Sequence, residues 1–301
     1  MSRIAIRTRA TLRTAAGHVL SSEPPMKNED SLGLRPLTAR SVVLSTLLGS
    51  HPPHLKARHL VRAGELFGIS EGTVRVALSR MVAAGDLVTD DGGYRLGGRL
   101  RERQARQDAS RSPLTREWDG SWEVAIVTAE RRPAAERAAF RDAMTALRMA
   151  EIREGVWMRP DNLVRSAPDG DAPGPAAAGP EPAGGADAGP ESIGGADAPP
   201  SPVTGQCMFL RAVPEGAPAA LAASLWDLPA WADRARALGE EFDAAVRVTD
   251  RFVLAAAILR HLLTDPLLPP GLLPGDWPGT GLRHRYDLFE AEFGALLRDH
   301  L

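Results

Sequence analysis

The stretch GISEGTVRVALSRMVAAGDL, from Gly68 to Leu87, predicts one amphipathic helix with a start signal and a stop signal. Ser70 is a favourable N-cap, because its hydroxyl can accept a hydrogen bond from a free backbone amide of the first turn. Gly85 suits the position just past the last turn, where the chain often adopts positive φ. Between them, apolar side chains recur every three or four positions and form one stripe that a core can bury. The stripe consists of Val74, Ala77, Leu78, Met81 and Val82.

The opposite side of this helix carries groups that can contact DNA. Arginine can form two hydrogen bonds with guanine, hydroxyl groups bind phosphates, and the side chain of Val76 can contact a thymine methyl. Gly72 lets the backbone approach the duplex closely, at the end of the helix where the dipole favours phosphate. A solvated surface charge is the alternative for each arginine taken singly. The candidate DNA contacts on this helix are Ser70, Gly72, Thr73, Arg75, Val76, Ser79 and Arg80.

Two helices precede this element and a hairpin follows it. The pattern predicts helices over residues 38–49 and 57–67, and two short strands about a glycine turn over residues 87–96. Three helices followed by a hairpin are typical of a winged helix-turn-helix, whose third helix enters a DNA groove. Two further candidate DNA contacts are Arg95 in the hairpin and Arg99 directly after it.

Charge is distributed unevenly along the chain. Residues 35–106 contain 12 Lys and Arg against six Asp and Glu, a net charge of +6, whereas residues 107–301 carry a net charge of −10. A polyanion attracts only the first of these regions. The charge pattern therefore indicates the same region for DNA binding as the helix pattern does.

Length and composition restrict the class of protein. A chain of 301 residues can hold two or three domains, and we find no apolar run of about 18 residues that could span a membrane. The single cysteine, Cys207, cannot form an intramolecular disulfide or a site with several thiolates, which fits a reducing compartment. Its apolar neighbours indicate a buried strand residue. We therefore expect a cytoplasmic protein with no membrane partner.

Two segments lack the pattern of a packed structure. Residues 166–202 contain no aromatic residue, Lys or Arg, and we expect a disordered linker because such a segment cannot bury enough apolar surface to offset its ordering entropy. An interaction tail is the alternative for this segment. Residues 1–34 are basic and lack the apolar core of a secretory signal, so we expect a disordered tail, with grazing contacts to DNA phosphates as the alternative.

The rest of the chain divides into a mixed region and a helical region. The order strand, helix, strand, strand indicates a small α+β sandwich. The expected elements of the sandwich are residues 122–127, 134–148, 154–158 and 206–213. Beyond it we expect helices over residues 219–238, 240–263 and 284–301, with a proline-rich loop over residues 265–278.

The quoted stretch resembles the recognition helix of PaaX-type regulators, the phenylacetic acid degradation repressor family. Four further motifs resemble that family in the same order, and the resemblance extends over about residues 36–300 apart from the linker. These motifs are WDGSW at residues 118–122, GVWMRPDNL at 155–163, LWDL at 225–228 and DPLLPPGLLPGDWPG at 265–279.

The resemblance implies a function and a domain order. It implies a repressor that binds palindromic operators of aromatic-acid catabolic genes as a homodimer and is released by an aryl-CoA thioester such as phenylacetyl-CoA. The implied α+β fold has a winged helix-turn-helix, a ferredoxin-like central domain and a helical C-terminal domain. The expected boundaries are a tail over residues 1–34, the winged domain over 35–110, the central domain over 117–215 interrupted by the linker 166–202, and the helical domain over 218–301.

The effector is expected to meet positive charge. If the C-terminal domains enclose a cleft, three arginines are candidates for binding the phosphates of an acyl-CoA, with structural ion pairs as the alternative for each. These effector candidates are Arg159, Arg211 and Arg260. The chain also departs from the family pattern, because the wing at residues 89–93 is short and acidic, Val76 stands where a threonine is common, and Ala256 and Ala257 replace a His-Glu pair. The operator and the effector therefore need not be those of the family.

An enzyme is the rival class. The implied central fold resembles small CRISPR-associated endonucleases, whose metal-binding aspartate follows the first strand, but here the nearest carboxylate is Glu130. We find no G-x-S-x-G motif, and no histidine near Cys207 in the sequence completes a nucleophilic site. His51, His54 and His59 lack the thiolate or carboxylate partners of a metal site. We therefore expect no catalytic residue, no metal and no cofactor, and retain a regulator with another effector, or none, as the main alternative.

Overall fold

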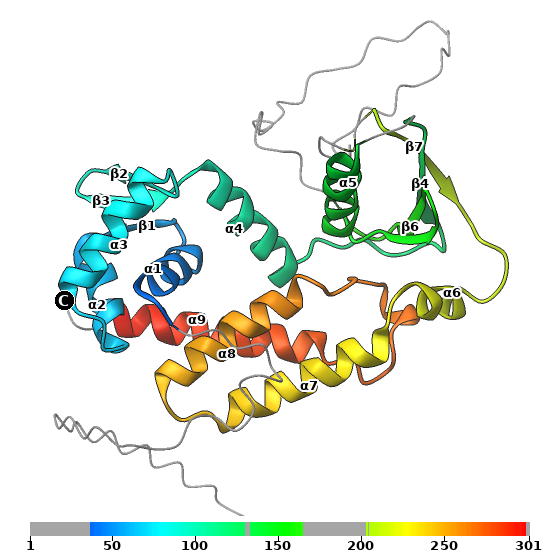
Figure 1. Ribbon diagram of the computed structural model, residues 1–301. Helices are drawn as coiled ribbons and strands as arrows, with labels where there is room; N and C mark the ends of the chain where they lie inside the picture. The colour runs from blue at the N-terminus through cyan, green and yellow to red at the C-terminus, as the bar shows by residue number, and fades with distance from the viewer. Residues whose placement is uncertain (1–36, 130–132, 165–202, 204, 299–301) are drawn as a thin grey trace, which may run out of the picture.

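The computed structural model describes residues 37–129, 133–164, 203 and 205–298. The tail expected over residues 1–34 and the linker expected over residues 166–202 lie outside these residues. The described chain forms three units, namely an N-terminal unit at one end, a small sheet with one helix at the other, and a layer of long helices that joins them (Figure 1). This arrangement confirms the α+β class.

The N-terminal unit has the expected order of three helices and a hairpin. A fourth helix, α4, follows the hairpin, and a short strand, β1, was not predicted. That strand pairs with β3 in the sheet order β1-β3-β2, so the hairpin becomes a three-stranded wing base. The elements are α1 (Ala39–Leu48), β1 (His54–Lys56), α2 (Ala57–Leu66), α3 (Glu71–Ala83), β2 (Leu87–Asp90), β3 (Gly93–Leu96) and α4 (Gly98–Arg111).

Local signals position α3 as the sequence predicts. The Ser70 hydroxyl accepts a hydrogen bond from the Thr73 amide at 3.3 Å, and Gly85 adopts a φ of 71° after the helix ends. The expected stripe faces inward, because Val74, Leu78 and Met81 are each at most 1% exposed. They pack in one core with side chains of α1, α2, the wing and α4, which fixes the direction in which α3 presents its other side.

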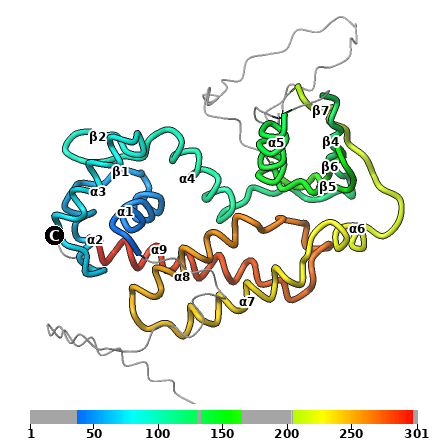
Figure 2. Tube along the Cα trace, in the orientation of Figure 1, coloured from blue at the N-terminus to red at the C-terminus, as the bar shows by residue number. Residues whose placement is uncertain are grey.

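The central unit is an antiparallel four-stranded sheet in the order β5-β6-β4-β7, with α5 on one face (Figures 1 and 2). Numbered from β4 along the chain, this is the strand order of a ferredoxin-like sheet. Strand β5 was not predicted. The elements are β4 (Trp122–Val127), α5 (Ala134–Ala146), β5 (Ala150–Arg153), β6 (Val156–Pro160) and β7 (Cys207–Ala212).

The strand expected over residues 154–158 begins two residues later. Gly155 has a φ of 76° and lies in the turn that joins β5 to β6, so residues 154 and 155 reverse the chain rather than extend it. Because β5 and β6 form a hairpin, the unexpected strand and the shifted strand have the same cause.

The C-terminal unit is helical, but its breaks lie elsewhere than expected. The helix expected over residues 219–238 is interrupted at residues 226–227, and the break expected at residue 239 lies inside a helix. Trp226 has extended backbone angles (φ −129°, ψ 135°), and Asp227 caps the next helix by accepting a hydrogen bond from the Ala230 amide at 3.1 Å. The last helix begins five residues before the expected start. The elements are α6 (Pro218–Leu225), α7 (Leu228–Ala244), α8 (Val248–Leu262), the short 3-10 helix η1 (Pro270–Leu272) and α9 (Gly279–Arg298).

The N-terminal and C-terminal units share a hydrophobic core. Val42 of α1 and Ala63 of α2 are fully buried among aromatic side chains of α8 and α9, including Phe252 and Phe289. In Figure 2 the last helix runs from the C-terminal layer to α2. The position of the N-terminal unit is therefore set by contacts with the opposite end of the chain.

Candidate nucleic-acid interface

The predicted contact side of α3 is open to solvent. Ser70, Gly72, Thr73, Ser79 and Arg80 are all exposed. The side chains of Arg75 and Val76 are 61% and 51% exposed, respectively. With the wing, α3 lies at the end of the molecule remote from the central sheet (Figure 1). The structure therefore brings the candidate contacts on α3 together on one uncovered side among the residues it describes.

Arg75 has an intrahelical partner that was not considered in the sequence analysis. Its guanidinium lies 2.6 Å from Oε1 of Glu71, one helical turn earlier, and both side chains are more than half exposed. An exposed pair of this kind contributes only about 0.3–0.5 kcal/mol, so a phosphate or a guanine can replace the glutamate. The spacing of four residues between Glu71 and Arg75 predicts this ion pair from the sequence, because such residues are neighbours on one helix face.

Arg99 and the wing arginine Arg95 are each held by a carboxylate. Arg95 is half-buried, and its Nε lies 3.3 Å from Oδ2 of Asp90. Arg99 is 83% exposed, and its guanidinium lies 3.3 Å from Oδ1 of Asp86. The acidic wing thus neutralises one of its own arginines, whereas Arg99 extends beside the end of α3.

Asp86 organises this corner of the unit, and sequence reasoning missed it. Its side chain is only 5% exposed and also binds the guanidinium of Arg40, on α1, at 2.6 Å. The hydrogen bond from Arg40 is the main cause that lowers the pKa of Asp86, opposed by burial and assisted by Arg99. One carboxylate therefore connects α1, the end of α3 and the start of α4. A lone aspartate after a glycine carries no pattern that reveals this role.

A second group of cations lies beside α3. Arg58 and Arg62 of α2 line a depression of about 500 Å³ together with Arg75, Glu65 and Glu71. The helix that precedes a recognition helix commonly crosses the DNA backbone, so these two arginines extend the candidate surface. His59 lines the same depression, and burial, followed by Arg58 and Lys56, lowers its pKa. This residue therefore adds little positive charge at neutral pH.

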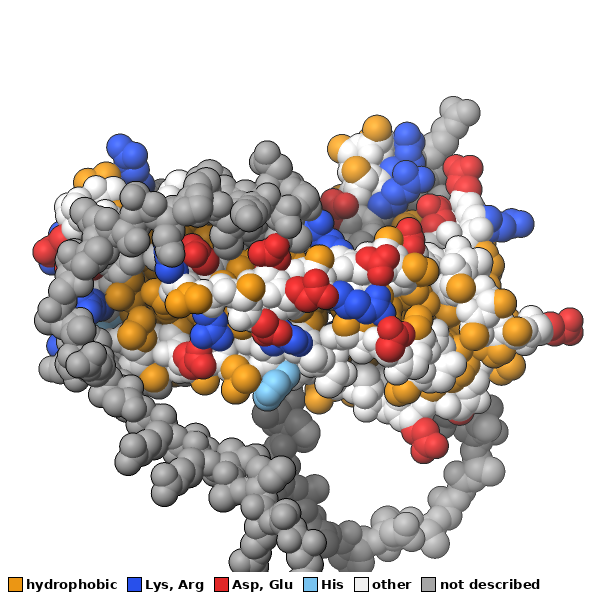
Figure 3. Space-filling view, turned by 90° about the horizontal axis from the view of Figure 1, so that it is seen from below, with side chains coloured by type: hydrophobic (Ala, Val, Ile, Leu, Met, Phe, Trp, Pro, Cys, Tyr) orange, Lys and Arg blue, Asp and Glu red, His pale blue; other side chains and the backbone are white. Residues whose placement is uncertain are grey.

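The positive surface does not continue over the underside of the C-terminal layer. Seen from below, the described atoms of that face show acidic and basic side chains close together (Figure 3). Ion pairs explain part of this pattern, because Arg285 binds Asp243 and Arg236 binds both Asp233 and Asp276. The accessible arginines of the N-terminal unit thus remain the candidate surface for a polyanion.

The structure does not bring the three effector candidates into one site. Arg159 and Arg211 lie on strands that flank β4, both in register with Glu123. Arg159 is only 1% exposed and donates to the carbonyl oxygens of Leu147 and Pro160 at 3.1 and 3.0 Å, which gives it a structural role. Arg211 binds Asp119 and Asp161 on the surface.

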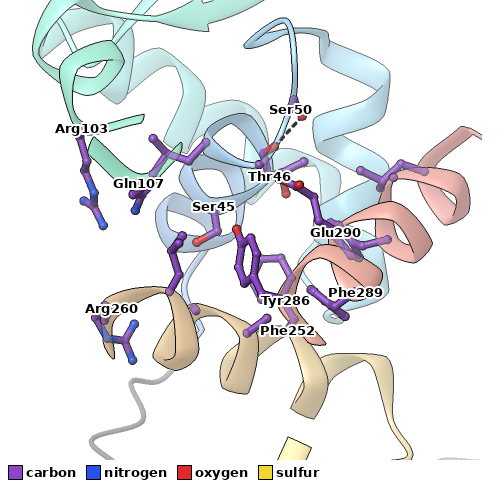
Figure 4. Close-up of a pocket in the computed structure, with 18 residues that line it drawn as sticks. Ser45, Thr46, Ser50, Arg103, Gln107, Phe252, Arg260, Tyr286, Phe289 and Glu290 are labelled. Atoms are coloured by element: carbon purple, nitrogen blue, oxygen red, sulfur yellow. Dashed lines mark hydrogen bonds between the residues drawn. The ribbon is translucent and has the colours of Figure 1, made fainter. Parts of the chain in front are cut away.

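Arg260 lies elsewhere, at a cavity between the N-terminal and C-terminal units (Figure 4). Arg103 of α4 and Arg260 of α8 lie on one side of this cavity, and Phe252 and Tyr286 lie beneath it. Burial raises the pKa of Tyr286, so its hydroxyl stays protonated. The volume is about 100 Å³, below the 150 Å³ or so that accepts one benzene ring. A larger ligand would have to separate the helices.

The described residues offer no metal centre. Among them, no three His, Cys, Asp or Glu side chains are grouped to hold an ion, and no helix is long and apolar enough to cross a bilayer. His51 binds Asp108 at 3.0 Å, and His54 contacts the carbonyl oxygen of Asp90. Cys207 packs on one face of the sheet and is half-buried, less than expected.

Fold and surface together define a winged-helix protein with a ferredoxin-like centre, and comparisons with known proteins specify its family. Residues 38–100 match the family described as PaaX-like protein, and residues 115–169 match the PaaX protein central Cas2-like domain. The solved structure of the uncharacterized protein Rv0674 from Mycobacterium tuberculosis is 46% identical, with a TM-score of 0.68 over 88% of this chain and 99% of that one. No curated protein matches the chain. The chain belongs to the PaaX-like family, whose members are generally transcriptional regulators.

Proposed function

We propose that this protein is a sequence-specific DNA-binding repressor whose helix α3 enters the major groove of an operator. The observation that carries the proposal is the orientation of α3, with its apolar stripe in the core and the side bearing Arg75 and Arg80 open to solvent. The net charge of +6 over residues 35–106 supports the same conclusion, because phosphate contacts supply much of the affinity for DNA.

The double substitution of Arg75 and Arg80 by alanine tests this proposal. Each arginine that reads a base contributes about 1–3 kcal/mol, so operator affinity should fall by roughly a hundredfold or more while the melting temperature stays unchanged. Operator sequences would come from selection on randomised duplexes, and binding from fluorescence anisotropy at fixed salt. Arg153→Ala, at an exposed position on β5, is the matched control. If the double variant binds the operator as tightly as the wild type does, α3 is not part of the DNA interface.

We further propose a homodimer on an inverted repeat. Two winged units bound to two half-sites multiply specificity, and their spacing should be one helical turn, about 34 Å, or a multiple of it. Light scattering of the free protein and the symmetry of the selected sequences test this point together. A monomer that selects single, unpaired half-sites would contradict it.

The proposed effector is an aryl-CoA thioester that relieves repression of phenylacetate-type catabolic genes. Membership of the PaaX-like family supports it, but the departures at Ala256 and Ala257 leave the acyl group open. Titration of phenylacetyl-CoA into the protein–operator complex should release the DNA, whereas free coenzyme A at equal concentration should not. If the complex keeps its DNA in the presence of phenylacetyl-CoA and of benzoyl-CoA, the effector proposal fails, and the DNA-binding proposal is unaffected.

A further inference from the structure

A second cavity lies where the three units meet. It has a volume of about 880 Å³, within the range of small-molecule sites. The end of α4, the end of α5 and the loop after α8 approach one another at this point (Figure 1). Its walls are largely apolar and include Leu114, Leu147, Leu163, Val164, Leu263 and Leu267.

Arg148 is the residue that connects the units at this cavity. Its guanidinium donates to Oγ of Ser110 at 2.6 Å, in α4, and to the carbonyl oxygen of Leu263, which caps α8. Arg148 itself follows α5 with a φ of 61°, a conformation that a non-glycine residue holds only where its surroundings enforce it. One side chain thus joins the N-terminal, central and C-terminal units.

The guanidinium of Arg148 has no bonded carboxylate among the residues that the structure describes. The nearby carboxylate of Asp265 is engaged by Arg283 at 2.6 Å. Burial lowers the pKa of Arg148 to about 10, with Asp265 raising it and Arg283 lowering it. A desolvated cation whose hydrogen bonds go to neutral oxygens gains strongly from an anion, so the cavity wall offers an anchor for negative charge.

The remaining charged groups restrict that anion. Arg106 and Arg159 also line the cavity, but so do Asp108 and Asp142. Two carboxylates near the site oppose a doubly charged phosphate more than a single carboxylate, because repulsion grows with the charge of the ligand. The apolar walls favour a ligand with a hydrocarbon or aromatic body.

We propose that this cavity binds a small monocarboxylic acid with an apolar body, whose carboxylate pairs with Arg148. The carboxylate would compete with Ser110 and Leu263 for the guanidinium, which would loosen the joint between α4 and the C-terminal unit. That regulatory consequence rests on the proposed DNA-binding function, whereas ligand binding itself does not.

Calorimetric titration of the full chain with 4-phenylbutyrate and octanoate, and with the corresponding neutral amides, tests the proposal. We expect both acids to bind at micromolar to millimolar concentration and both amides to bind at least tenfold more weakly. Arg148→Gln should weaken the acids at least tenfold, and Arg153→Gln, at an exposed position, should not. Leu163→Trp should also abolish binding by filling the cavity, which keeps the test valid if Arg148→Gln fails to fold.

Three results would overturn the proposal, namely no binding of either acid, equal binding of acids and amides, or undiminished binding by the Leu163→Trp variant. Operator binding by the unliganded wild-type protein is measured in parallel. If the acids do not bind but the operator does, the ligand proposal fails and the proposed regulator function stands. If the acids bind but the operator does not, the ligand site stands and the proposed DNA-binding function fails.

Discussion

At the scale of single residues, Asp86 contributes most to the geometry of the candidate interface. It is buried, while its partners Arg40 and Arg99 are 57% and 83% exposed. Sequence reasoning found Arg99 as a candidate but could not find its partner, because the contact joins the turn after α3 to the first turn of α4, 13 residues away along the chain. The same holds for Arg148, whose two partners lie 38 and 115 residues away along the chain.

We predict that Asp86→Asn lowers the free energy of unfolding by about 1–2 kcal/mol at neutral pH, because two charged hydrogen bonds are lost and exposure of the arginines limits the effect. The pKa of Asp86 is lowered in the folded state. Its stabilisation is therefore present above the unfolded pKa, near 3.8, and disappears as pH falls through the folded value. Urea denaturation from pH 7 down to pH 3 should show the free energies of unfolding of the wild type and the variant converging below about pH 4.

Asp91→Asn, in the exposed wing turn, is the control for this prediction. A constant difference between the wild type and Asp86→Asn at all pH values would contradict the assignment.

At the scale of elements, helix α3 and the hairpin of β2 and β3 were predicted, whereas strands β1 and β5 were not. The stripe on α3, the cap at Ser70 and the stop at Gly85 are local signals, and the structure confirms the helix that they predict. Strands β1 and β5 have three and four residues, too few for an alternating pattern, and each exists because a neighbouring strand offers hydrogen bonds. The break at Trp226, in contrast, carried local signals that the sequence reasoning missed, because Asp227 caps α7 and Pro229 lies in its first turn.

Two glycines, Gly64 in α2 and Gly72 in α3, give a prediction at this scale. A methyl group on Gly64, in α2, would lie 2.4 Å from Cγ2 of Val74, whereas a methyl group on Gly72 meets nothing within 4 Å. Gly64→Ala should therefore push α3 away from α2 and cost about 1–3 kcal/mol of stability. Gly72→Ala should raise stability by about 0.5–1 kcal/mol, because alanine favours the helix. Thermal melts measure both.

The Gly72→Ala variant also distinguishes an effect on stability from an effect on DNA contact. If α3 approaches DNA closely at Gly72, the more stable Gly72→Ala variant should bind operator several-fold more weakly. Equal affinity of Gly72→Ala and the wild type would exclude a close backbone contact at this position. A Gly64→Ala variant with unchanged stability would show that α2 and α3 adjust at no cost.

At the scale of the whole molecule, α4 and α9 lock the N-terminal unit onto the C-terminal unit. The Arg111 side chain, 15% exposed, binds Asp287 at 3.0 Å and also Glu290, and lies over the ring of Tyr286. Burial raises the pKa of Glu290, and the opposing effect of Arg111 offsets this only in part. Removal of the arginine would leave a half-buried carboxylate without its main partner.

We predict that Arg111→Ala lowers the free energy of unfolding by about 2–3 kcal/mol, since an ion pair that is largely withdrawn from water loses one member. Hydrogen exchange should rise in α4 and α9 but not in the central sheet. Arg101→Ala, exposed on the same helix, is the control. Uniform exchange in all three units would instead show that the effect is global and that Arg111 does not act at this joint.

The sequence by itself determined the α+β class, helix α3 and the side of α3 that faces solvent, because caps, glycine stops and apolar periodicity act over a few residues. Only the tertiary structure decided which arginines act together. Arg159 lies in the core, Arg260 lines the same cavity as Arg103, and Arg148 joins all three units, although as a type of residue they are identical. Their electrostatic environments depend on groups that folding brings from distant parts of the chain, and a pattern of neighbouring residues cannot contain that information.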